Sequence, residues 1–228
     1  MQWIHGRYLK NRDWWSYTRS SDTSWHWKKL LKVRDRFKTY PVDVYKVNEG
    51  YTWLLQNPTI PKWSKFIWTR LSIPRHSLAA WLFMHQRLPV LHRLNNHTTL
   101  SSTTCILCQQ YSETQEHLFF RCSYATKLWE GVLKDWQVNI QLIGMEEFIH
   151  SLTKLHMSIR KRALFYAMVN AVIYNIWTAR NRKMFNNIAY HTDDALKEIK
   201  RQVTLRVLQM HQTSHKYSSY LDILLSTQ

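Results

Sequence analysis

The three cysteines of this chain all lie within eighteen residues, and a histidine lies among them. They form the pattern C-x2-C-x8-H-x4-C, made by Cys105, Cys108, His117 and Cys122. Three thiolates and one imidazole are ligands that Zn²⁺ prefers in tetrahedral sites. Because such a set leaves no open position, it predicts a structural zinc ion and not a hydrolytic one. The alternative is three buried thiols and an unrelated histidine. A disulfide framework is disfavoured, since no cysteine is left over.

The rest of the chain is typical of a helical fold. Only 4 Gly and 5 Pro occur among the 228 residues, which argues against short strands joined by tight turns. Apolar residues instead recur at spacings of three and four, the period of an amphipathic helix. We therefore expect a mainly α protein: a helical domain stapled by a small Cys₃His zinc module.

Several helices can be located from this spacing and from boundary signals. Ser24 is a candidate N-cap for a helix that follows it, and Pro74 is expected to end an earlier one. Thr192 is a second candidate N-cap, with Asp193 and Asp194 in a first turn where acids suit the helix dipole. The expected helices cover about 63–71, 77–88, 113–120, 124–136, 145–158, 159–185 and 192–210, with a short one at 90–94.

A capping box is indicated just before the histidine of the cysteine cluster. Ser112 precedes Glu113 and Gln115, which predicts the start of a short helix that carries His117. That helix would turn the imidazole toward the first two cysteines. Residues 118–120 would then shield the metal site from water.

The longest apolar run, residues 163–177, is predicted to be a buried helix. It is shorter than the ~20 residues that a membrane span needs, and it contains two asparagines. We therefore expect no membrane partner. The free thiols suit a reducing compartment. We expect an intracellular protein, in the nucleus rather than the cytoplasm. One side of the long helix should be buried, through Leu164, Met168, Val172, Ile176 and Trp177.

The sequence suggests three segments that differ in composition. The first is basic, rich in Trp and partly disordered, with a poorly packed start (1–23) and a linker with short extended pieces (41–60). The second holds the cysteine cluster. The third is helical, with a frayed tail from His211. The expected boundaries are 1–60, 61–136 and 137–228.

Positive charge is concentrated in two flanks. The chain carries 32 Lys and Arg against 15 Asp and Glu, a formal net charge of +17. Residues 1–40 hold ten bases and three acids (+7), and residues 154–206 hold eleven and three (+8). The middle, residues 41–153, holds ten and eight (+2). Because nucleic acid is the usual partner of so basic a chain, we expect RNA or DNA to bind the flanks.

Seven basic residues in these flanks are candidate phosphate contacts. The alternative is that the charges belong to ordinary solvated helix faces and that the nearby tryptophans are core residues. Contacts to phosphate would be salt-dependent and would carry little sequence information. The candidates are Lys28, Lys29, Lys32, Arg34, Arg180, Arg182 and Lys183.

An ordered string of residues around the cysteines resembles a known domain. It runs through Trp63 to Trp68, Pro74, Trp81, Arg87-Leu-Pro89, the two spaced cysteines, Glu113-Thr114, His117-Leu-Phe-Phe120, Cys122 and Trp129. The string resembles the zinc-binding domain that follows the reverse transcriptase in plant LINE-type non-LTR retroelements. Val90 stands where that family usually has Thr. The segment from Ile176 to Phe185 resembles the W-x-x-R-N-x-x-x-F stretch that follows the module in the same polyproteins.

The resemblance implies a zinc-binding module that accompanies a polymerase and does not itself catalyse a reaction. A polymerase needs paired aspartates near other carboxylates to hold two metal ions. The adjacent pair Asp193-Asp194 lies at an expected helix start and lacks the family's preceding Tyr. The chain therefore looks like a detached or truncated reading frame and not an enzyme. The alternative function is a structural or protein-interaction domain without a nucleic-acid role. Four further histidines, interpreted as surface residues and not as a second metal site, are His76, His85, His92 and His97.

Overall fold

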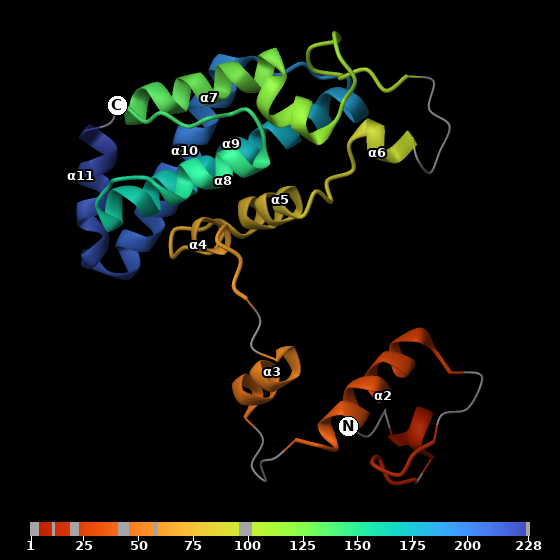
Figure 1. Ribbon diagram of the computed structural model, residues 1–228. Coiled ribbons are helices and arrows are strands. Elements are labelled where there is room, and N and C mark those ends of the chain that lie inside the picture. Colours follow the sequence, from red (N-terminus) through yellow and green to blue (C-terminus); the bar gives the residue numbers. More distant parts are fainter. Residues whose placement is uncertain are drawn as a thin grey trace. The chain divides into compact units, whose positions relative to one another are not determined.

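The computed structural model is mainly helical. About 68% of the described residues lie in helices. Within the part described, the extended backbone amounts to one isolated antiparallel bridge, between Thr104 and Ser112. The expected mainly α fold is confirmed (Figure 1). The structure describes residues 5–10, 12–18, 23–40, 46–56, 59–95 and 102–226.

The chain divides into two compact units, residues 1–60 and residues 61–228. In the first unit a π-helical turn, η1 (His5–Leu9), precedes α2 (Trp25–Phe37) and α3 (Val47–Leu55). The hydroxyl of Ser24 accepts a hydrogen bond of 3.3 Å from the backbone N–H of Trp27, so the predicted N-cap of α2 is confirmed.

The start of the chain packs better than its composition indicates. Leu9 and Tyr17 are buried with Trp27 and Leu31 of α2 in a small core. The Trp27 ring is stacked on Tyr8 at a centroid distance of 4.2 Å. The expectation of a poorly packed start is therefore wrong for the residues described, because the aromatic side chains supply a core of their own.

Helix α3 occupies the segment that was expected to be a linker. Its Trp53 ring lies 5.5 Å from Phe37 and 5.3 Å from Tyr40, measured between centroids. A guanidinium N–H of Arg36 donates to the carbonyl oxygen of Leu54. These contacts with the end of α2 stabilise a short helix that its own composition, with a central Gly50, does not predict.

The second unit is a helical domain built around one long helix. Its buried apolar side chains form one hydrophobic core, whose members come from all parts of the sequence between Phe66 and Leu224. The helices are α4 (Ser64–Ile67), α5 (Pro74–Met84), α6 (Leu91–Asn95), the π-helical turn η2 (His117–Arg121), α7 (Ser123–Trp136), α8 (Met145–Thr153), α9 (Ile159–Asn186), α10 (Thr192–Thr213), η3 (His215–Tyr217) and α11 (Ser218–Ser226).

Helix α9 is the centre of this domain. Helices α4, α5, α7, α10 and α11 all pack against it, so every residue from 164 to 173 is buried. A helix covered on all sides needs no polar face. The predicted one-sided stripe is therefore too narrow: Leu164, Met168, Val172 and Ile176 are buried as expected, but Trp177 is only partly buried.

Pro74 begins a helix instead of separating two long ones. It occupies the first turn of α5, where proline's missing N–H costs nothing. The preceding helix, α4, is one turn long, and the chain then bends. The hydroxyls of Ser72 and Ser77 both donate to the carbonyl oxygen of Ile67, at 2.7 and 3.1 Å, and hold this bend.

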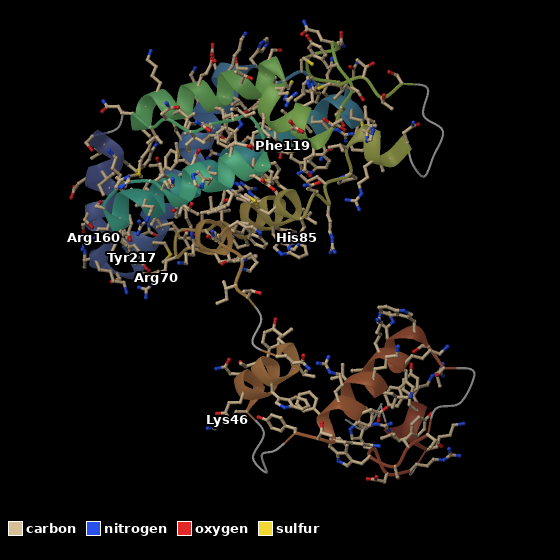
Figure 2. The ribbon with its side chains drawn as sticks, in the orientation of Figure 1. Lys46, Arg70, His85, Phe119, Arg160 and Tyr217 are labelled. Atoms are coloured by element: carbon tan, nitrogen blue, oxygen red, sulfur yellow. The ribbon has the colours of Figure 1, made fainter. Side chains whose placement is uncertain are left out.

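The C-terminal part of the domain is ordered helix. Asp193 and Asp194 lie in the first turn of α10, as predicted, but Thr192 is the first helical residue and not the cap. The expected frayed tail is wrong over residues 211–226: Tyr217 and Leu224 are buried against the core. Tyr217 is labelled at the turn between α10 and α11 (Figure 2). No helix in the described part of the chain is long and apolar enough to cross a membrane.

Candidate metal centre and basic surfaces

A tight loop carries the first two cysteines. The N–H of Cys105 donates to the carbonyl oxygen of Tyr111 at 2.7 Å, and that of Glu113 donates to Thr103 at 2.7 Å. Within the loop, the N–H of Gln109 donates to the carbonyl oxygen of Cys105 at 2.8 Å, and Gln109 has a φ of 57°. This turn folds Cys105 and Cys108 toward the same point.

The π-helical turn η2 places the other two ligands. The N–H of Cys122 donates across five residues to the carbonyl oxygen of His117, at 2.7 Å. The N–H of His117 in turn donates to the hydroxyl of Thr114, at 3.0 Å. The helical turn is therefore capped by Thr114, and the predicted cap at Ser112 is wrong, because Ser112 forms the bridge to Thr104 instead.

The four side chains converge on one point. One donor atom from each of Cys105, Cys108, His117 and Cys122 lies within 4.8 Å of all the others. The sulfurs of Cys105 and Cys122 are 3.9 Å apart, and Cys108 Sγ is 3.2 Å from His117 Nε2. Tetrahedral zinc with Zn–S bonds of ~2.3 Å requires a sulfur–sulfur separation of about 3.8 Å. The donor set and its spacing fit zinc.

The residues of the cluster differ in protonation. The thiol of Cys105 donates to the sulfur of Cys122, which raises the pKa of Cys105 and lowers the pKa of Cys122. Burial lowers the pKa of His117, because the charged imidazolium is poorly solvated there. At Cys122 and His117 these shifts favour the thiolate and the neutral imidazole, the forms that bind metal.

The residues between His117 and Cys122 anchor the site to the domain core. Leu118, Phe119 and Phe120 are buried. The Trp129 indole N–H donates to the carbonyl oxygen of Phe119 at 2.7 Å, which ties η2 to α7. Phe119 lies inside the second unit (Figure 2). The cysteine cluster therefore lies directly against the hydrophobic core, which includes Cys105 and Cys122.

A buried ion pair joins the cluster loop to α9. Arg180 donates to Glu113 Oε1 through Nε at 3.1 Å and through Nη2 at 2.8 Å, and the N–H of Leu91 donates to the same oxygen at 2.9 Å. The exposed fractions of the Glu113 and Arg180 residues are 0% and 1%. Sequence reasoning missed this pair. A sequence signal for it exists, because Glu113 and Arg180 both belong to the motifs that carry the family resemblance.

The N-terminal candidate contacts differ in accessibility. Lys29 and Lys32 are exposed on α2, and Lys28 is half-buried. The Lys29 ammonium lies 5.2 Å from the ring centroid of Trp25. Arg34 is 7% exposed and donates to the carbonyl oxygens of Trp14 and Tyr17, at 2.8 and 2.7 Å. Arg34 therefore holds the unit together.

The C-terminal candidate phosphate contacts also differ in accessibility. Arg182 is exposed, with its guanidinium 5.3 Å from the ring centroid of Tyr190. Lys183 is half-buried and donates to the side chain of Asn187 at 3.3 Å. Arg180 is buried with Glu113. The two buried arginines, Arg34 and Arg180, are therefore left out of the phosphate contacts proposed below.

The four other histidines do not form a second cluster among the residues described. His76 is 1% exposed and stacks on Tyr174 at a centroid distance of 4.5 Å, so its interpretation as a surface residue is wrong. Burial lowers the pKa of His76 to about 4. His85, labelled in Figure 2, and His92 are exposed. The His85 ring lies 4.8 Å from that of Trp81, measured between centroids. His97 lies outside the described residues.

Comparison with known proteins supports the interpretation of the cysteine cluster. Residues 45–129 match a family model described as zinc-binding in reverse transcriptase. The matched segment contains all four converging donors, and the family is the zinc-binding region and not the catalytic part of the polymerase. Neither the curated proteins nor the solved structures contain a match.

Proposed function

We propose that this protein is a non-catalytic nucleic-acid-binding module held together by one structural zinc ion. The observation that carries the proposal is the convergence of four zinc-type donors inside a segment similar to the zinc-binding region of reverse transcriptases. The resemblance to plant LINE-type retroelements makes such an element the proposed origin. A nuclear location suits that origin.

The zinc ligands in this proposal are Cys105, Cys108, His117 and Cys122. Bound there, Zn²⁺ supplies a closed four-coordinate link between the loop and η2. Residues beside the ligands hold η2 in place: Thr114 caps the turn, and the aromatic residues of η2 anchor it in the core. The site is structural because all four positions are filled by protein.

Nucleic-acid binding is supported by the distribution of charge. The two basic flanks carry +7 and +8, while the middle of the chain carries only +2. The accessible or partly accessible candidate cations are Lys28, Lys29, Lys32, Arg182 and Lys183. Neutralising phosphates releases counterions, so affinity should fall steeply as salt rises and should discriminate little between sequences.

Two measurements on the purified protein test this function. The first is the zinc content by elemental analysis, expected to be one ion per chain. The second is a fluorescence anisotropy titration with RNA and DNA oligonucleotides at several salt concentrations. We expect binding at about 0.15 M salt with a linear fall of log K against log salt. Zinc without any nucleic-acid binding would leave the structural or protein-interaction domain as the better account. Absence of zinc would overturn the metal centre.

A further inference from the structure

The first unit contains a basic pocket beside a half-exposed tryptophan. Residues 15–18 form one wall, and one face of α2 forms the other. The volume is about 540 Å³. Pockets that hold small ligands are roughly 300–1,000 Å³, so this one is large enough for a nucleotide. It lies outside residues 45–129, the segment that the zinc-binding family covers.

Cations line the helical wall of this pocket. Lys28, Lys32 and Lys38 lie along one side of α2 and its C-cap, with Asp35 between them. With Arg34, four cations face one carboxylate, a balance of +3. Asp35 is already bound by Arg34 at 2.7 Å and by Lys38 at 3.6 Å. Among the described residues, Lys28 and Lys32 have no carboxylate within ion-pair distance, so an outside anion can use both.

The opposite wall presents an aromatic surface on a fixed loop. Trp15 is 50% exposed, whereas its neighbour Trp14 packs against Trp27 at a centroid distance of 5.6 Å. The buried guanidinium of Arg34 donates to the carbonyl oxygens on either side of Trp15, those of Trp14 and Tyr17. The loop is therefore held before any ligand arrives, which lowers the entropy lost on binding.

We propose that this pocket binds one nucleotide of a single strand, with the base stacked on Trp15 and the two backbone phosphates on either side of this nucleotide bound by Lys28 and Lys32. This inference rests on the proposed nucleic-acid function and locates one binding site for it. Sequence-tolerant recognition of single strands combines a cationic groove with an aromatic side chain on which a base stacks. In a duplex the bases are already paired and stacked, so the pocket selects single strands.

Anisotropy titrations with a labelled 12-nucleotide single strand and its duplex, run on the full chain, test the proposal. Trp15→Leu should weaken single-strand binding by about fivefold or more and leave duplex binding unchanged, because stacking of one base is lost. Trp15→Phe, which keeps a ring, should retain most of the affinity. Trp68→Leu is the matched control: Trp68 is 58% exposed and lies in the second unit.

The two lysines are tested by the salt dependence of the same binding. Lys28→Gln with Lys32→Gln should lower the single-strand salt slope by about 1.4, the value for two phosphates at ~0.7 each. Lys127→Gln with Lys134→Gln, on the exposed face of α7, removes the same charge from residues outside the two basic flanks of the sequence and should leave the slope unchanged.

Three results would overturn the inference. If Trp15→Leu binds the single strand as the parent protein does, the pocket is not used although the wider function stands. The pocket is likewise not a nucleotide site if Trp15→Leu weakens tight binding to phosphatidylserine vesicles while single-strand affinity stays unchanged, which would identify a membrane surface as the ligand. If the parent binds neither single strand nor duplex, the proposed function itself fails and the inference with it.

Discussion

Glu113 and Arg180 form a buried ion pair across 67 residues of sequence, with Arg180 Nη2 2.8 Å from Glu113 Oε1. The carboxylate lies four residues before His117, and the guanidinium lies near the end of α9. The pair thus connects the loop of the candidate metal centre to the central helix. Because Leu91 also donates to Glu113, three separate segments meet at one carboxylate.

Glu113→Gln should destabilise the second unit by about 3–5 kcal/mol, because it leaves the charge of Arg180 buried without its partner. Urea denaturation measures the free energy of unfolding. Glu116→Gln is the matched control, since Glu116 pairs with Arg121 at the surface, where an ion pair contributes about 1 kcal/mol or less. Equal losses of unfolding free energy in the two variants would show that the buried pair stabilises the protein no more than the surface pair does.

Cys108→Ser should remove zinc and unfold the cluster loop, because metal binding supplies much of the folding free energy of such a loop. Hydrogen exchange should show lost protection over residues 102–122, and elemental analysis should show less than one zinc per chain. His85→Asn changes an exposed histidine outside the cluster and should keep both. Full zinc retention by Cys108→Ser would contradict the assigned ligand set.

Arg182→Gln with Lys183→Gln should lower the slope of log K against log salt by up to about two units if each side chain contacts a phosphate. Arg180 is excluded from this variant, because its loss would break the pair with Glu113. Lys127→Gln with Lys134→Gln again serves as the charge-matched control. An unchanged slope would assign the two cations to the solvated end of α9.

His76 should make the protein less stable in mild acid. Its pKa is about 4 in the folded state and 6.5 in the unfolded chain, so only the unfolded chain takes up a proton between these values. Its contribution is therefore nearly complete at pH 7.5 and falls by about 1.4 kcal/mol on going from pH 7.5 to 5.5. His76→Phe keeps a ring against Tyr174 and should reduce the difference in unfolding free energy between pH 7.5 and 5.5 by that amount. An identical pH dependence in both proteins would contradict a buried neutral imidazole.

The sequence predicts the ligand cluster and the larger helices because these depend on local spacing. Cys105, Cys108, His117 and Cys122 are close in the chain, so a turn and one short helix suffice to bring them together. The apolar period likewise locates α7 (Ser123–Trp136) and α9 (Ile159–Asn186) to within a residue or two of their ends.

What the sequence could not predict depends on partners far along the chain. Helix α3 is stabilised by Phe37 and Tyr40, and α9 is buried on all sides by five other helices. From the sequence, Arg34 and Arg180 look like surface cations. In the structure both are buried, because carbonyl oxygens bind Arg34 and a carboxylate binds Arg180. His76 gives no sign of burial because its stacking partner, Tyr174, lies on another helix.

The central position of α9 has a consequence for the order of events during synthesis. The side-chain amide of Asn170 donates to the carbonyl oxygen of Phe66, 104 residues earlier, and the ribosome adds residues in sequence. Helices α4, α5 and α7 therefore leave the ribosome before α9 is synthesised, and until then their apolar faces are exposed to solvent. During that interval the local cysteine cluster is the part that can form first, since all its ligands are already present.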